Sequence, residues 1–221
     1  MAQTLQEQIE SMNQDTLKDF KVTDFIKRLS DGTINPERFK QWVRNIYPTV
    51  IGFTDSLEAN MRRAESTMPQ LAKKMQNQLV EEREHNRVWE NFMVSIGLDY
   101  GSINKGYNPN NSMNVLNNWL WSVNSNPNYS IQEGIASIYG VEAVLLPIVE
   151  HSLKGITGVA RRCSPNSDVK WFQIHTEGEE KEHAKQGLAF LGSYNGSPIA
   201  QKIIDSIKTT HRDFLDTVKT S

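Results

Sequence analysis

Apolar residues recur at every third or fourth position along most of the chain, which is the spacing of an amphipathic α-helix. No segment alternates apolar and polar residues with the two-residue period of a strand. The pattern predicts seven helices, at about residues 16–31, 35–57, 68–96, 115–123, 130–154, 167–192 and 197–219. We therefore expect an all-α, single-domain helical bundle that spans residues 1–221.

Capping residues and glycines mark several ends of the predicted helices. Asn35 can cap the second helix, and Pro36 suits its first helical position. Gly97 and Gly155 are expected to end the third and the fifth helix. Residues 98–112 are rich in Gly, Asn and Ser and are predicted to form a long loop.

The composition narrows the class of protein. The chain has 221 residues, of which 38% are hydrophobic, and a formal net charge of −2. No cluster of Lys and Arg lies on a predicted helix face, so nucleic acid is not an expected partner. The first residues lack the features of a secretory signal, and no run approaches the roughly 20 apolar residues of a membrane span. A single cysteine, Cys163, agrees with a reducing compartment. We expect a cytoplasmic protein that does not bind membranes.

Two ionisable residues of the third predicted helix face its apolar side. With a rotation of about 100° per residue, Glu82 lies within about 20° of the apolar stripe and His85 about 60° to one side. The stripe consists of Leu71, Met75, Trp89 and Met93. Glu81 falls at the edge of the stripe and Glu84 on the opposite side. Glu82 and His85 thus form an inward Glu-x-x-His pair, which can offer an oxygen and a nitrogen to one metal. Taken alone, such a pair also arises by chance.

The fifth predicted helix carries a second inward carboxylate, Glu142. Its stripe consists of Ile131, Ile135, Ile138, Leu145, Leu146 and Val149. Glu133 lies nine residues earlier, faces about 180° away and is expected to be solvated. A core glutamate paired with an arginine, or hydrogen-bonded to a tryptophan, is the alternative to a metal ligand.

The sixth predicted helix contains His175, Glu179 and His183, spaced by four residues so that one face presents all three. Glu182 has an angle from Glu179 no worse than that of His183, so either of the two can be the last ligand. The other histidines, His151 and His211, have no such neighbours and are expected to be structural.

Carboxylates and imidazoles from three core helices match a non-haem centre of two iron ions, with manganese as the alternative metal. Structural zinc sites prefer thiolates, and Cys163 is not in a ligand spacing.

These motifs resemble the haem-oxygenase-like di-iron oxidases, most closely the branch that includes the fatty-acid decarboxylase making 1-undecene. The order of Glu-x-x-His, a lone Glu in an apolar helix, and His-x-x-x-Glu followed by His is similar in that family. Four segments carry the resemblance, FKQWVRNIYPTVIGF, VEEREHNRVWENF, IYGVEAVLLPI and WFQIHTEGEEKEHA, within residues 36–191. The resemblance implies a seven-helix haem-oxygenase-like bundle.

The resemblance also implies a role for each ligand. Glu82, His85 and His175 would bind one iron, Glu142 would bridge, and Glu179 and His183 would help to hold the other. The family spaces its last two ligands as Asp-x-x-His, whereas three residues separate them here. A π-bulge would bring His183 into line, and without a bulge Glu182 could substitute.

The implied chemistry is dioxygen activation by two Fe(II) ions, with O₂ as co-substrate, acting on a small carboxylate-bearing molecule. An amino acid is favoured, oxidised by C–C or C–N cleavage, N-oxygenation or nitrile formation, and oxidative decarboxylation of a fatty acid is the alternative. Arg44, Tyr47 and Tyr139 are the candidate substrate-binding residues. Two further alternatives are a metal-free thiaminase-like hydrolase that uses Cys163 and a non-enzymatic partner-binding protein. A homodimer is left open.

Overall fold

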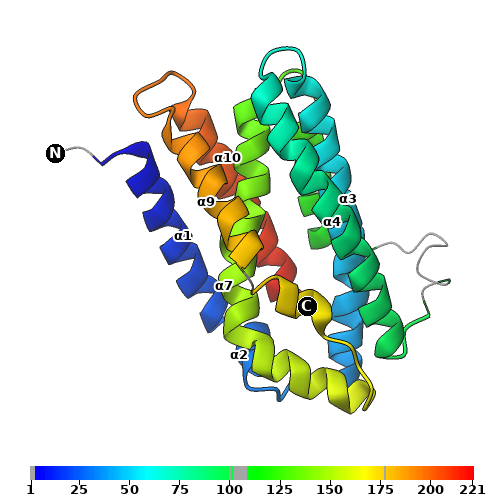
Figure 1. Ribbon diagram of the computed structural model, residues 1–221. Coiled ribbons are helices and arrows are strands. Elements are labelled where there is room, and N and C mark those ends of the chain that lie inside the picture. Colours follow the sequence, from blue (N-terminus) through cyan, green and yellow to red (C-terminus); the bar gives the residue numbers. More distant parts are fainter. Residues whose placement is uncertain (1–2, 100, 102–108, 177) are drawn as a thin grey trace.

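The structure is a computed structural model that describes residues 3–99, 101, 109–176 and 178–221, without the side chains of Glu179 and Glu180. The described residues form nine helices in one bundle (Figure 1). They are α1 (Leu5–Val22), α2 (Asp24–Ser30), α3 (Pro36–Ala64), α4 (Pro69–Ser95), α6 (Asn111–Ser125), α7 (Ile131–Cys163), α8 (Lys170–Ile174), α9 (Gly178–Gly192) and α10 (Ala200–Lys219). The all-α prediction is confirmed, and the helices exceed the predicted seven because two predicted helices are each interrupted once.

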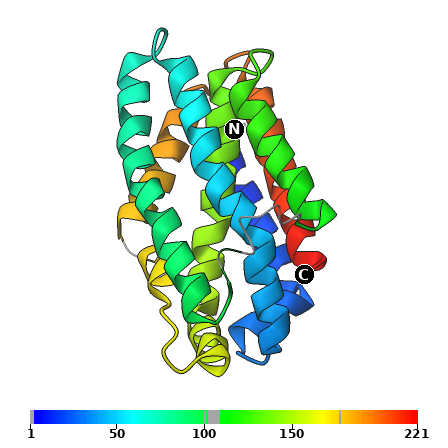
Figure 2. The same cartoon turned by 90° about the vertical axis from the view of Figure 1, so that its right-hand side faces the viewer.

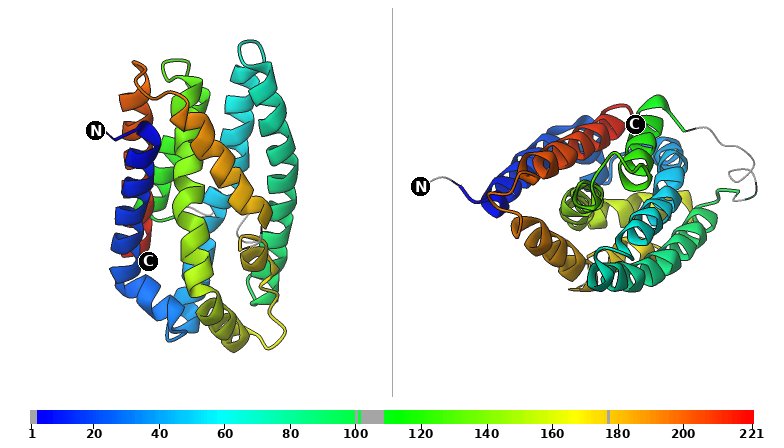
Figure 3. Two further views of the ribbon diagram at one scale, coloured as in Figure 1. Left: turned by 60° about the vertical axis from the view of Figure 1, so that its left-hand side comes forward. Right: turned by 90° about the horizontal axis from the view of Figure 1, so that it is seen from above.

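Helix α7 is the central element of the bundle. It packs against α1, α2, α3, α6, α9 and α10, which surround it in the view from above (Figure 3). By length and composition α7 could cross a membrane, but 67% of its most apolar window is buried inside the bundle. This burial is typical of the core helix of a globular protein.

Helices α3 and α4 form an antiparallel pair, and α6 packs beside α3 (Figure 2). The predicted start of α3 is confirmed, because the Asn35 side chain accepts a hydrogen bond of 2.8 Å from the backbone N–H of Glu37, and Pro36 is the first helical residue. The end of α4 is also confirmed: Gly97 follows it with φ of 81°, which glycine adopts without steric cost.

The first predicted helix is wrong in its start and in its continuity. Helix α1 begins at Leu5, where Thr4 and Glu7 form a reciprocal capping box that satisfies the free N–H groups of the first turn. The helix then breaks at Thr23. The hydroxyl of Thr23 donates to the carbonyl of Phe20 and accepts from the N–H of Ile26, so it closes α1 and caps α2.

Gly155 does not end α7, which continues to Cys163, and the predicted loop after Gly155 is therefore wrong. The glycine serves a close contact between helices instead. A Cβ atom built on Gly155 would lie 1.9 Å from the carbonyl oxygen of Leu29 at the end of α2. Only a residue without a side chain allows α2 to approach α7 this closely.

The predicted helix 167–192 is interrupted between α8 and α9. His175 caps the C-terminus of α8, and the Thr176 hydroxyl donates to the carbonyl of Gln173 at 2.8 Å. Helix α9 then begins at Gly178 with a new direction (Figure 3). The prediction that one continuous helix face presents His175 and His183 is thus wrong.

The predicted short helix at 115–123 is longer than expected. The Asn110 side chain accepts a hydrogen bond from the N–H of Met113 and starts α6 at Asn111, four residues earlier than predicted. Most of the predicted loop at 98–112, namely residue 100 and residues 102–108, lies outside the described part of the chain.

Candidate functional site

Four elements of the bundle bring the predicted metal ligands together in its interior. Glu82 and His85 lie on α4, Glu142 on α7, His175 at the end of α8 and His183 on α9. Three of them are almost completely buried, with exposed fractions of 6% for Glu82, 6% for Glu142 and 4% for His175. Ionisable side chains buried this far need compensation, and a cation bound between them would supply it.

One group of ligand atoms combines Glu82, His85 and His175. One atom from each residue lies within 4.8 Å of the others. A carboxylate oxygen of Glu82 lies 3.4 Å from Nδ1 of His85, and the rings of His85 and His175 have centroids 5.0 Å apart. The three side chains can therefore reach one ion between them.

The imidazole of His175 is prepared to act as a neutral ligand. Its Nδ1 lies 2.7 Å from the carbonyl oxygen of Trp171, which can only accept, so Nδ1 carries the proton and Nε2 keeps its lone pair. Burial lowers the pKa of His175 to about 4, so the ring is uncharged at neutral pH. A hydrogen bond from the distal nitrogen to a carbonyl is the usual way in which proteins orient a metal-binding histidine.

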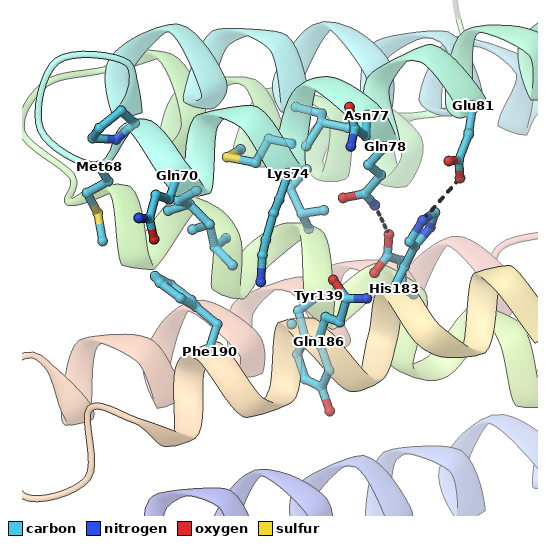
Figure 4. Close-up of a pocket in the computed structure, with 18 of the residues that line it drawn as sticks. Met68, Gln70, Lys74, Asn77, Gln78, Glu81, Tyr139, His183, Gln186 and Phe190 are labelled. Carbon is cyan, nitrogen blue, oxygen red and sulfur yellow. Dashed lines mark hydrogen bonds and ion pairs between the residues drawn. The ribbon is translucent and has the colours of Figure 1, made fainter.

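A second group combines Glu82, Glu142 and His183, again with one atom of each within 4.8 Å of the others. Gln78 donates a hydrogen bond of 2.6 Å to a carboxylate oxygen of Glu142, and Nε2 of His183 lies 3.1 Å from Glu81 (Figure 4). The break before α9 positions His183 here without the π-bulge that the sequence suggested.

Glu82 belongs to both groups, so the two sets form one continuous cluster with Glu82 in the middle. The resemblance assigns the bridging role to Glu142, whereas in the structure Glu82 is the residue common to both groups. A cluster of oxygen and imidazole nitrogen donors in two overlapping sets fits two first-row transition-metal ions, and iron or manganese suits this mixture.

Glu179 and Glu182 were the other candidates on the last ligand helix. The side chain of Glu179 lies outside the described part of the structure, so its predicted role stays a prediction. The side chain of Glu182 is 52% exposed and lies 3.5 Å from Lys185, on the solvent side of α9. Of the pair left open by the sequence, His183 therefore lies in the cluster and Glu182 does not.

Two cavities meet at the cluster. The larger has a volume of about 780 Å³ between α4, α7 and α9, and Glu142 is one of its lining residues. His183 lies at its inner end, beside Glu81 (Figure 4). The smaller encloses about 50 Å³ and is lined by Glu82, His85, Glu142 and His175. The apolar remainder of its wall includes Ile46, Val50, Phe53, Leu116, Val141, Leu145 and Phe214. Because Glu142 lines both cavities, the cluster lies between a small, mostly apolar chamber and a larger pocket with both polar and apolar lining residues.

The three predicted substrate-binding residues have different environments. Tyr139 lines the larger pocket. Its hydroxyl accepts a hydrogen bond of 2.6 Å from Asn13 on α1, and burial raises the pKa of Tyr139 to about 12. The hydroxyl of Tyr47 lies 3.3 Å from a carboxylate oxygen of Glu90. Neither Tyr47 nor Arg44 lines either of these cavities, so their role in substrate binding stays a prediction.

Sequence reasoning missed the residues that support the ligands. Trp171 stacks on the imidazole of His175 with centroids 3.8 Å apart, and Trp89 lies 4.6 Å from Trp171 in an edge-to-face contact. This aromatic wall holds the imidazole in place. Gln78 was also missed, although it lies four residues before Glu82 and only about 40° from it around the helix. The sequence places Glu81 at the edge of the apolar stripe but gives it no part in the site.

Glu133, His151 and His211 lie outside the ligand cluster. The expectation that Glu133 is solvated is wrong: it is 9% exposed because it forms the capping box of α7 with Ser130. His151 is exposed on α7. His211 is buried, with Nδ1 2.9 Å from the hydroxyl of Thr16, as expected for a structural residue.

Cys163 is placed far from a catalytic arrangement. It is the last residue of α7, where its thiol contacts the carbonyl oxygen of Pro36 at 3.8 Å, and burial raises its pKa. Cys163 lines neither cavity at the cluster. A raised pKa disfavours the thiolate, which is the nucleophilic form of cysteine.

Comparisons with known proteins agree with this architecture. The sequence model of a family described as iron-containing redox enzymes matches residues 40–211, which include every ligand of the cluster. No curated protein matches the chain at a significant level.

Solved structures with the same fold cover almost the whole chain. A TenA homologue from P. horikoshii has a TM-score of 0.77 at 14% identity, over 99% of this chain and 99% of that one. A TenA homologue from Pyrococcus furiosus has a TM-score of 0.75 at 17% identity, over 97% and 98% of the two chains. A domain of unknown function with a heme oxygenase-like fold from Shewanella denitrificans has a TM-score of 0.72 at 16% identity, over 96% and 91%. The predicted haem-oxygenase-like fold is thus confirmed, while the resemblance to the decarboxylase branch stays a prediction.

Proposed function

This chain belongs to the family of iron-containing redox enzymes, and we propose that it is a non-haem di-iron oxygenase or oxidase. In this proposal it uses two Fe(II) ions to activate dioxygen and oxidises a small carboxylate-bearing substrate. The observation that carries the proposal is the pair of overlapping ligand groups that share the buried Glu82.

The donor set favours iron over zinc. The cluster offers carboxylate oxygens and imidazole nitrogens and no thiolate, because the chain's single cysteine lies at the far end of α7. Iron and manganese accept this mixture, and carboxylate-rich sites inside helical bundles are typical of di-iron and di-manganese proteins. The family match supports iron as the working metal, with manganese as the alternative.

The residues would divide the work as follows. Glu82, His85 and His175 would hold one ion, and Glu82, Glu142 and His183 the other. When bound, two ferrous ions supply the electrons that reduce dioxygen. The protein's part is to keep the ligands in position and to keep bulk water away from the reacting atoms.

The small chamber suits dioxygen. Its volume of about 50 Å³ is enough for a molecule about the size of water, so a diatomic gas fits. Its walls are mostly apolar side chains such as Ile46, Phe53 and Leu145, which favour a nonpolar gas over water.

The larger pocket suits the organic substrate. Its volume of about 780 Å³ lies within the range of small-molecule sites, and its wall combines four amide side chains with apolar groups. The amides belong to Gln70, Asn77, Gln78 and Gln186. A wall of this kind supports a small polar molecule such as an amino acid over a long fatty acyl chain. Oxidative decarboxylation of a fatty acid remains the second candidate because of the sequence resemblance.

The hydrolase alternative lacks support at the site. A thiaminase-like reaction needs a thiolate beside the substrate, and Cys163 has a raised pKa and lines neither cavity. A purely partner-binding protein would have no need to bury this set of carboxylates and imidazoles. The ligand cluster therefore favours an enzyme.

An oxygen-consumption experiment tests the proposal. Iron-loaded protein is mixed with O₂ and with separate pools of amino acids and fatty acids, and uptake is followed with an electrode. We expect uptake that depends on one pool and is lost in His175→Ala. The control, His151→Ala, replaces an exposed histidine of α7 and should retain full activity. Equal uptake by the two variants would refute the proposed role of the cluster.

A further inference from the structure

The wall of the larger pocket carries charges of both signs. Besides Tyr139, four lining residues are ionisable, namely Lys74, Glu81, Glu142 and His183. Three of them have partners within the pocket: Glu81 pairs with His183 at 3.1 Å, and Glu142 accepts a hydrogen bond from Gln78. Lys74 is the one lysine or arginine among the described lining residues, and it makes no ion pair with any described carboxylate.

The direction of Lys74 is set by helix α4. Lys74, Gln78 and Glu81 are spaced by four and three residues, so they share one face of the helix, whereas Lys73 points about 100° away. The Lys74 side chain extends from α4 across the pocket toward α9, and its ammonium group ends near Tyr139 and Gln186 (Figure 4). Lys74 is exposed, and an ammonium group that extends over a pocket in this way can receive an anion.

On the basis of the proposed function, we propose that Lys74 binds the carboxylate of the substrate and that the oxidised atom belongs to a different part of the molecule. Lys74 precedes the shared ligand Glu82 by eight residues, which corresponds to about 12 Å along the helix axis. A carboxylate at Lys74 is therefore remote from the ligand cluster. The substrate's other end reaches Glu142 and His183.

The other lining residues of the larger pocket indicate which groups the substrate carries besides its carboxylate. Amide groups from Gln70 and Gln186 offer neutral hydrogen bonds near Lys74, and Met68 and Phe190 provide apolar contacts at the outer end (Figure 4). Lys74 is the one lysine or arginine among the described residues that line the pocket, so a single carboxylate is matched there. The substrate class is thus a monocarboxylate with a polar or aromatic body, such as an amino acid, and its carboxyl group is retained in the product.

Binding measurements on the full chain test this assignment. Isothermal titration calorimetry gives the Kd of 3-phenylpropanoate and octanoate and of their uncharged amides, with the protein as purified and again after metal removal. We expect each acid to bind about tenfold or more tightly than its amide, as for a hydrogen bond between charged groups. Lys74→Gln should abolish this preference, and Lys74→Arg should keep most of it. The control, Lys73→Gln, changes an exposed neighbour on the same helix and should behave like the wild type.

Three results would overturn the assignment. The first is an acid preference that survives in Lys74→Gln, and the second is the absence of any acid binding to the wild type. The third is tighter binding of phenyl phosphate than of either acid, with the same loss in Lys74→Gln, which would assign the site to phosphate esters. Because metal-free protein is included, these results are separate from those of the oxygen-uptake experiment. Loss of oxygen uptake with intact acid binding would contradict only the proposed redox function.

Discussion

Replacing Glu82 by glutamine should make the metal-free protein more stable and at the same time abolish metal binding. Glu82 and Glu142 place carboxylate oxygens within 4.8 Å of each other in the interior. Two like charges at that distance repel by about 3 kcal/mol at an effective dielectric constant of about 20. Two described contacts offset part of this repulsion: His85 lies 3.4 Å from Glu82, and Gln78 donates a hydrogen bond of 2.6 Å to Glu142. The cluster is therefore costly to fold without a cation.

The expected gain in the free energy of unfolding is about 1–2 kcal/mol, since glutamine keeps the volume of the side chain but loses the contact with His85. For a domain of this size such a gain raises Tm by about 2–8 °C. Differential scanning calorimetry of Glu82→Gln and of wild-type protein, both freed of metal, measures the difference. Adding Fe(II) without oxygen should then raise Tm of the wild type and leave the variant unchanged.

Glu84→Gln is the matched control, because Glu84 lies two residues further on α4 in an exposed pair with Arg87. Pairs of this kind contribute about 0–1 kcal/mol, so the control should change Tm little and keep the response to Fe(II). A metal-free Glu82→Gln protein that is less stable than the wild type would refute the reasoning. Glu82 would then be an ordinary hydrogen-bonded core residue.

Three further predictions concern the other corrected or newly assigned residues. His183→Ala should lower the iron content of the loaded protein from two ions per chain to one, measured by metal analysis after gel filtration. The control, Glu182→Ala, should keep two ions. Equal iron contents in the two variants would contradict the assignment of His183. Gly155→Ala should lower the free energy of unfolding in urea by about 1–3 kcal/mol or more, because the new Cβ would lie 1.9 Å from a backbone carbonyl oxygen of α2. An unchanged midpoint of urea unfolding would disprove that contact. Burial lowers the pKa of His211 to about 4, so the unfolded chain, with an ordinary value of 6.5, binds the proton first. The contribution of His211 to stability is therefore fully present above pH 6.5 and falls by about 3 kcal/mol toward pH 4. His175, whose pKa burial also lowers to about 4, adds a similar fall, so His211→Gln should reduce the pH dependence of urea unfolding by about half.

The ligands on long, unbroken helices could be predicted from the sequence. Glu82, His85 and Glu142 lie in the middle of α4 and α7, where the helical period holds over many turns and the facing angle is reliable. The cap at Asn35 was equally clear, because a capping side chain and the first turn it satisfies are neighbours in the sequence.

The features that depend on contacts between distant segments could not be predicted. The break after Ile174 lies inside a segment with helical periodicity, and no proline marks it. Gly155 was interpreted as a helix end because glycine often has that role, whereas its actual role is a contact with α2. Glu133 was assigned to solvent from its angle alone, although the third residue of a helix commonly turns back to cap the first turn.

The large pocket escaped prediction for the same reason. Its lining comes mainly from α4, α7 and α9, which are distant in the sequence and meet only in the folded bundle. On the sequence alone, Lys74 is one of many lysines on a helix surface, and only the approach of α9 turns its position into part of a binding site.

Anaerobic titration of the metal-free protein with Fe(II) tests the central claim most directly. Iron bound per chain is measured after gel filtration, and the ligand field is followed by near-infrared circular dichroism. We predict about two tightly bound ions in the wild type and none in Glu82→Gln, the residue common to both ligand groups. A wild-type chain that binds no iron, or that binds the same amount as Glu82→Gln, would contradict the di-iron site.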